Sequence, residues 1–151
     1  MDQLMDDLIG RFHELHDDLI KTVEGLPAEA LDFIPGKEMN PITVLVVHLL
    51  GAERYWVGVA LDEASDRDRE AEFKTTGLTS DDLIGRINAQ EDYIRNALGR
   101  LSLMDLGSMH ISPRNKKSMS AGWCILHALE HSALHLGHAQ IGRQLWEQRH
   151  G

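Results

Sequence analysis

Apolar residues recur at spacings of four and three in the first part of the chain, and most positions between them are polar. The repeat runs through Leu4, Leu8, Phe12, Leu15, Leu19 and Val23. Residues at these spacings share one face of an α-helix, so the pattern predicts an amphipathic helix over about residues 2–24. Gly25 and Pro27 follow directly and are typical of a helix end.

A second helix is predicted over about residues 41–61, because Asn40 and Pro41 are a common pair at a helix start. Its first turns are apolar on almost every side, so we expect this helix to be deeply packed. The longest apolar run of the chain, residues 44–50, belongs to this helix and is interrupted by His48. Such a run is far too short to span a bilayer, so no membrane partner is expected.

Two more helices are predicted in the second half of the chain. Thr79 or Ser80 can cap a helix whose apolar stripe continues to Leu101. Ser118 or Ser120 can cap a last helix, which we expect to end near the C-terminus of the chain.

The segments between these helices are predicted to be connections. Residues 62–76 are charged and irregular, and residues 102–117 contain Gly107, Pro113 and a basic run. No segment alternates between apolar and polar positions as a strand would. The pattern therefore predicts an all-α fold, a four-helix bundle, in a single domain over residues 1–151. The two long connections permit a crossover topology.

Composition and charge narrow the function. The chain has 24 Asp or Glu residues against 15 Lys or Arg residues and a formal net charge of -9, so nucleic acid is not an expected partner. The single cysteine, Cys124, excludes an intramolecular disulfide. The first residues lack the basic and then apolar pattern of a signal peptide, so we expect a cytoplasmic protein.

The last predicted helix carries four histidines in the stretch HALEHSALHLGH. His127, His131, His135 and His138 fall within about 80° of arc, because spacings of four and three return to nearly the same helix face. Large apolar residues lie on or beside the same line: Trp123, Leu134, Ile141 and Leu145. We therefore expect the histidines to face the bundle interior. An unpaired imidazole is costly there, and a metal ion is one kind of partner.

His48 supplies a candidate ligand from a second helix, because it lies among apolar residues in the most apolar part of the chain. One histidine from one helix and an i, i+4 pair from another can converge on a single ion. Neutral imidazole suits zinc or nickel, and three protein ligands leave the open coordination position of a catalytic site. The alternative is a group of hydrogen-bonded core histidines that bind no metal.

The histidine stretch also resembles peptidase motifs, but neither one fits. From His127 it has the form H-x-x-E-H, and that class needs a further acidic ligand. Glu147 is the only acid after His131 and lies four turns further along the same helix. Between His131 and His135, the forward motif would need a Glu where this chain has Ser132. A peptidase is therefore not favoured.

Other enzyme classes are weaker still. A di-iron bundle needs Glu-x-x-His on each of two helices, and the chain does not have two such motifs. We interpret Cys124 as a small buried hydrophobe rather than a nucleophile. His16 and Asp17 form an HD dipeptide without the companion residues of an HD-type hydrolase, so we place them on the helix surface.

Two segments carry a resemblance to a known family. The stretches MNPITVLVVHLLGAERYWVG and GWCILHALEHSALHLGHAQIGRQLW are similar to the second and last helices of the DinB/YfiT-like family of small bacterial metalloenzymes. That family includes thiol-dependent S-transferases and is related to the metal-binding domain of mycothiol-dependent maleylpyruvate isomerase. The resemblance covers nearly the whole chain and implies an up-down-down-up four-helix bundle, often a homodimer.

The resemblance also implies a site. The metal ligands of the family fall on His48, His131 and His135, with nickel or zinc as the divalent ion. His127 and His138 are candidates for residues beside the ligands or in a substrate pocket. Glu53 is at a position where relatives often carry Glu, and a structural or interfacial role is expected for it. The very apolar second helix leaves room for a dimer face.

Three functions follow as hypotheses. The first is a metal-dependent enzyme that acts on a small-molecule substrate with a low-molecular-weight thiol, such as mycothiol or bacillithiol, as in S-transferases; a metal-dependent hydrolase is a variant. A bound cation ionises a coordinated thiol without a protein base. The second is a non-catalytic binding or interaction module that the ion staples together. The third is a bundle without metal.

Overall fold

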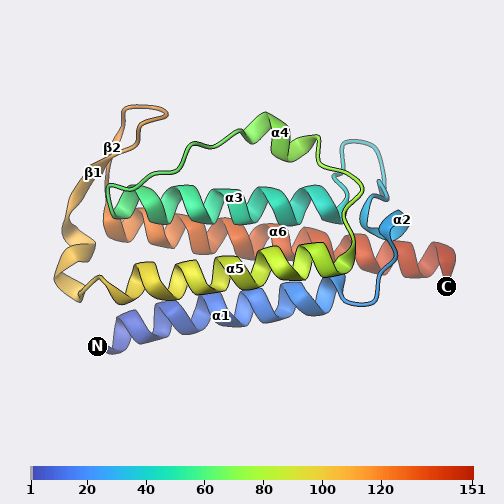
Figure 1. Ribbon diagram of the computed structural model, residues 1–151, viewed down its shortest axis with the longest axis horizontal. Coiled ribbons are helices and arrows are strands. Elements are labelled where there is room, and N and C mark those ends of the chain that lie inside the picture. Colours follow the sequence, from blue (N-terminus) through green and yellow to red (C-terminus); the bar gives the residue numbers. More distant parts are fainter. Residues whose placement is uncertain (1) are drawn as a thin grey trace.

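Four long helices form the body of the protein, whose computed structural model describes residues 2–151. They are α1 (Gln3–Val23), α3 (Ile42–Ala60), α5 (Ser80–Gly99) and α6 (Ala121–His150). Helices α1 and α6 run in one direction along the bundle, and α3 and α5 run in the other (Figure 1). This is the predicted up-down-down-up four-helix bundle.

Short elements occupy the connections. They are α2 (Ala28–Leu31), α4 (Arg69–Phe73), the 3-10 helix η1 (Leu103–Gly107) and the strands β1 (Met109–Ile111) and β2 (Ser118–Ser120). The strands pair antiparallel, with Met109 opposite Ser120. The sequence pattern predicts only irregular connections in residues 62–76 and 102–117, and this is wrong for α4, η1 and β1. Elements of three to five residues are too short to display a helical or strand period.

Capping residues mark the helix starts much as predicted. The hydroxyl of Ser120 accepts a hydrogen bond from the backbone N–H of Trp123 at 3.0 Å. Thr79 and Asp82 form a reciprocal capping box at the start of α5. Helix α3 begins at Ile42, one residue later than predicted, and Pro41 rather than Asn40 is its cap residue.

Each long helix packs against two others, so that the four form a ring in the order α1, α5, α3, α6. Two hydrophobic clusters fill the ring along its length. One includes Phe12 and Ile125, and the other includes Leu19 and Leu49.

Helix α3 is deeply packed, as its composition predicts, because most of its residues are buried. Among residues 2–151 it is the one helix long and apolar enough to cross a membrane, but 78% of its apolar window is buried inside the bundle, as in a core helix. Its apolar surface is therefore largely used within the fold rather than left for a dimer face. The homodimer and the cytoplasmic location stay predictions.

Helix α6 presents a different face to the core than its large residues suggest. Trp123, Leu134 and Ile141 are between 46% and 56% exposed, so the prediction that they line the interior is wrong. The buried stripe consists mainly of small residues: Ala121, Cys124, Ala128, Ser132, Ala139 and Gly142. Small side chains let α3 approach closely, and a Cβ at Gly142 would lie 3.3 Å from the Ile42 side chain. His127, His131, His135 and His138 therefore lie at the border between core and solvent rather than in the interior that the sequence pattern predicts.

Candidate metal centre

Three imidazoles converge where α3 crosses α6. His48 comes from α3, and His131 and His135 come from successive turns of α6. One nitrogen of each ring can be chosen so that all three lie within 4.8 Å of one another. The Nε2 atoms of His48 and His131 are 3.1 Å apart. The structure thus brings together the three residues that the sequence analysis selects, while metal binding itself stays a prediction.

The imidazoles of His131 and His135 are held neutral. Burial and the neighbouring histidines lower the pKa of His131 to about 3 and that of His135 to about 4. At neutral pH one nitrogen of each of these rings therefore carries a lone pair, which metal coordination requires. Neutral imidazoles without a carboxylate among them are a donor set that suits zinc or nickel.

One nitrogen of the cluster lacks a partner. Within residues 2–151, Nδ1 of His131 is buried and has no hydrogen-bond partner. An unsatisfied buried polar atom costs about 1–3 kcal/mol. Because Nε2 is the atom of His131 that faces His48, a cation held between these two Nε2 atoms would leave Nδ1 as it is. The fit to a divalent ion therefore rests on the three convergent imidazoles themselves.

The far side of His48 is bonded to a carboxylate that the sequence analysis missed. Nδ1 of His48 lies 3.0 Å from Oε1 of Glu72, which is buried. Arg67 donates two hydrogen bonds to the same carboxylate, from Nε and Nη2, each at 2.9 Å. Burial would raise the pKa of Glu72, but the bonds from His48 and Arg67 lower it, so the group is ionised at neutral pH. No spacing marks these residues, because they lie in a short charged connection.

Phe73 and the two remaining histidines surround the cluster. The ring of Phe73 lies over His48, with 4.7 Å between ring centroids. His127 stacks on Trp123 at 4.8 Å and lies 6.1 Å from the His131 ring. Nδ1 of His138 lies 3.2 Å from Nδ1 of His135. His138 therefore touches a candidate ligand, whereas His127 belongs to an aromatic group one turn away.

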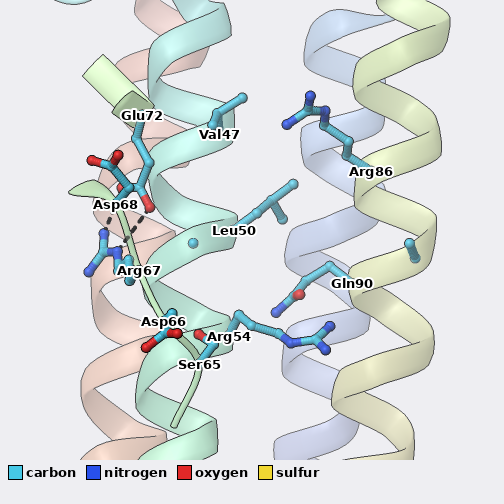
Figure 2. A pocket seen from close by; sticks show the side chains of 12 residues that line it. Val47, Leu50, Arg54, Ser65, Asp66, Arg67, Asp68, Glu72, Arg86 and Gln90 are labelled. Carbon is cyan, nitrogen blue, oxygen red and sulfur yellow. Dashed lines mark hydrogen bonds and ion pairs between the residues drawn. The ribbon is translucent and has the colours of Figure 1, made fainter. Parts of the chain in front are cut away.

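Hollows lie on both sides of α3. A cavity of about 220 Å³ adjoins the cluster. Its lining consists of Glu38, Met39, Asn40, Leu45, His135, His138 and Ile141. A wider hollow of about 430 Å³ lies between α3, α5 and residues 65–72. Figure 2 shows Arg67 and Glu72 on its α3 side, with Arg86 and Gln90 approaching from α5. The smaller cavity is the one that includes a candidate ligand.

A second polar group lies deeper in the bundle. His16 is 2% exposed, so its predicted place on the helix surface is wrong. Its Nε2 lies 2.9 Å from Oε2 of Glu53, and its Nδ1 bonds to Glu91. Glu53 is fully buried and also accepts hydrogen bonds from Gln90 and Ser132. The sequence analysis could not find His16 because its acidic partners come from α3 and α5.

Cys124 has no role in the site. It is completely buried in α6, and burial raises the pKa of its thiol to about 11. A thiol with this pKa is almost entirely protonated at neutral pH and is a poor nucleophile.

Comparisons with known proteins identify the family of the chain and solved structures with a similar fold. A family model described as the DinB superfamily matches residues 11–139. No curated protein matches the chain. A conserved protein from Enterococcus faecalis has 12% identity and a TM-score of 0.79, over 96% of this chain and 98% of its own. YfiT from Bacillus subtilis, described as a probable metal-dependent hydrolase with an unusual four-helix bundle topology, has 15% identity and a TM-score of 0.76, over 99% of this chain and 90% of its own. At these identities the likeness is one of fold.

Proposed function

Because the chain belongs to the DinB superfamily, we propose that it is a divalent-metal-dependent enzyme whose ion is held by His48, His131 and His135. One observation carries this proposal: three imidazoles from two helices converge to within 4.8 Å. A set of three protein ligands is typical of catalytic sites, because structural zinc sites are usually closed by four ligands. Nickel and zinc are the ions that we expect.

The nucleophile in this proposal is a low-molecular-weight thiol, such as mycothiol or bacillithiol. A bound divalent ion would lower the pKa of a coordinated thiol and ionise it at neutral pH. A thiol needs no protein base for this, since its ordinary pKa is already about 8.5. The only carboxylate that touches the cluster within residues 2–151, Glu72, is engaged by His48 and Arg67 and cannot also deprotonate water. This supports S-transfer over hydrolysis.

The cavity of about 220 Å³ beside His135 is the proposed place for the small-molecule substrate. Met39, Leu45 and Ile141 would contact its apolar part. His138, which lines the cavity and touches His135, would donate or accept a hydrogen bond at its polar end.

Hydrolysis is the second candidate. It is supported by the description of YfiT, which has the same fold, as a probable metal-dependent hydrolase. In this version His138 would be the base that receives a proton from water, since it lies in the cavity next to a ligand. A hydrolase would act without any thiol.

Metal content tests the site itself. We expect about one equivalent of a divalent ion in the untagged protein, measured by mass spectrometry, and a loss of this ion in His131→Ala. His13→Ala is the matched control, because the side chain of His13 is 49% exposed on α1. A protein that takes up no nickel, zinc or manganese on reconstitution would overturn the proposal.

Thermal unfolding separates the functions that a metal site could have. Ligands that bind the native state raise the unfolding temperature by mass action. An unfolding temperature that rises when metal is added, and rises further when a thiol is added to the metal-bound protein, supports the transferase. A rise with metal that is indifferent to thiols, together with hydrolysis of a panel of esters and amides, supports the hydrolase. The same rise without any turnover indicates a metal-stapled module.

A further inference from the structure

The connection between α3 and α5 contacts the three-histidine cluster through Glu72, which is bonded to His48. It runs back along the outside of α3 and includes α4, as Figure 1 shows. Figure 2 shows Arg67 and Glu72 of this connection side by side next to α3. Their carboxylate and guanidinium are joined by two hydrogen bonds of 2.9 Å, and both side chains are less than 10% exposed. The connection therefore places a buried, fixed carboxylate behind His48.

A glycine makes room for this carboxylate. Gly51 lies three residues after His48 on α3, and a Cβ built on it would be 2.1 Å from Oε2 of Glu72 and 2.9 Å from its Cδ. Contacts below 3.0 Å essentially never occur, so any other residue at this position would displace the Glu72 side chain. Glycine is a poor helix former, and its presence inside a core helix calls for a packing reason. The seat of Glu72 is that reason.

We propose that Glu72, seated against Gly51 and held by Arg67, is a positioning residue for the metal centre. Nδ1 of His48 lies 3.0 Å from Oε1 of Glu72 and 3.2 Å from Nη2 of Arg67, which already donates to the same oxygen at 2.9 Å. In this proposal the carboxylate is the partner of Nδ1 and holds the proton there, so that Nε2 presents its lone pair toward His131. This rests on the proposed metal site and adds to it a residue that controls one ligand. A carboxylate behind a ligating histidine orients the ring and increases its basicity, and its loss typically weakens metal binding 10–100-fold.

A purely structural role for the Arg67–Glu72 pair predicts something different. Such a pair would only fasten the connection to α3, and its loss would lower stability without changing the tautomer of His48. Metal affinity and the state of the His48 ring are therefore the measurements that separate the two roles.

The first experiment compares metal affinities in a competition with a chromophoric chelator. We expect Glu72→Ala to bind zinc or nickel 10–100-fold more weakly than the wild type. Glu72→Gln should be intermediate, because its amide oxygen still accepts from Nδ1 but carries no charge. Glu70→Gln is the matched control on the same helix, because Glu70 is 80% exposed and, within residues 2–151, forms its ion pair with Lys74. Equal affinities in the wild type and a folded Glu72→Ala would overturn the proposal.

The second experiment fills the space at Gly51 that the Glu72 carboxylate occupies and leaves the carboxylate itself unchanged. Gly51→Ala should displace the flexible end of Glu72 while the protein stays folded, and should weaken metal binding as much as Glu72→Ala does. The double variant should be no weaker than either single variant, since both remove the same contact. Gly85→Ala is the control, because a Cβ there meets nothing within 4 Å. Additive losses in the double variant would overturn the shared mechanism.

The third measurement needs no metal. Nitrogen NMR of the histidine rings in the metal-free protein should find the proton of His48 on Nδ1 in the wild type. In Glu72→Ala it should find a mixture of the Nδ1 and Nε2 tautomers. An unchanged tautomer in the variant would overturn the positioning role even if the wild type binds metal. A tautomer that changes as expected in a protein that binds no metal would instead overturn the proposed function, and the role in metal binding with it.

Discussion

Two polar groups share the interior of this bundle, one around His16 and one made of His48, His131 and His135, and they have opposite electrostatic surroundings. Both nitrogens of His16 are bonded to carboxylates. Burial lowers the pKa of His16, but the hydrogen bonds and charges of Glu53 and Glu91 outweigh it and raise the pKa to about 9. In the other group, burial and the adjacent imidazoles lower the pKa of His131 to about 3. His16 therefore carries a positive charge that two carboxylates of the protein balance, whereas His131 is neutral and can bind a cation.

The first group is complete in itself. Glu53 of α3 is bonded to His16 of α1, Gln90 of α5 and Ser132 of α6, so one carboxylate joins all four long helices. Along α1, His16 lies between Phe12 of one hydrophobic cluster and Leu19 of the other. A fully satisfied polar layer at this place permits one register of the helices, because any shift would leave a buried charge unpaired.

The difference teaches that burial alone does not identify a functional histidine. His16 is the more buried residue, yet its partners are all supplied by the fold. His131 is half-buried and keeps a nitrogen without a partner in the part of the chain that the structure describes. What distinguishes the candidate ligands is that three imidazoles converge on one another, with burial and the neighbouring histidines lowering the pKa values of His131 and His135.

The largest effect should come from breaking the complete group. Glu53→Ala removes the acceptor at Nε2 of His16 and leaves Glu91 as the one carboxylate bonded to this buried charge, so we expect the free energy of unfolding to fall by about 3 kcal/mol or more. Glu130→Ala is the control, because Glu130 is an exposed glutamate of α6 and its removal should cost no more than about 0.5 kcal/mol. Urea unfolding in the presence of a chelator measures both. A loss below 1 kcal/mol in Glu53→Ala would contradict the assigned role.

Adding a metal ion to the three-histidine group should stabilise the protein. Free zinc or nickel at one hundred times its dissociation constant should raise the free energy of unfolding by about 2.7 kcal/mol. His135→Ala should lose this gain, because one of the three ligands is missing. His16→Gln should keep it, although this variant starts from a lower stability. Thermal unfolding with excess metal and with chelator checks all three proteins, and equal gains in all of them would place the ion elsewhere.

The pH dependence of stability should reveal the charge on His16. Its stabilising contribution is complete below pH 6.5, the ordinary histidine pKa, and is lost as the pH rises through about 9. We expect a contribution on the order of 3 kcal/mol, since each pKa unit between 6.5 and about 9 corresponds to about 1.4 kcal/mol. Urea unfolding of the wild type and His16→Gln between pH 6 and 10 measures the difference. A difference that does not shrink across this window would mean that His16 is neutral in the native state.

The smallest effect should be that of His131→Ala without metal. The lost packing of a half-buried ring and the relief of its unpaired nitrogen oppose each other, so the net change should stay within about 1 kcal/mol. Chelator-treated protein and urea unfolding provide the measurement. A destabilisation as large as that of Glu53→Ala would make the histidine cluster structural and remove the contrast between the two groups.

Sequence reasoning anticipated the bundle and the convergence of its three histidines, but it misplaced the large residues of α6 and the side chain of His16. The starts of α5 and α6 at Thr79 and Ser120 are encoded by the capping residues themselves. The orientation of α6 was mispredicted, because large apolar residues such as Trp123 were assigned to the core. The buried face instead has small residues that allow α3 to come close. Amphipathic pattern alone does not distinguish these cases when a helix is apolar on more than one side.

The sequence by itself determined the four long helices and the histidine pair on one face of α6, because helical periodicity and capping depend on residues a few positions apart. Only the tertiary structure decided that Glu72 reaches His48 across 24 residues and that Glu53 meets His16 across 37. The partners of a buried ionisable group are set by how helices pack against each other, and no local pattern records that packing. For this reason the candidate ligands could be named in advance, but the carboxylate that holds one of them could not.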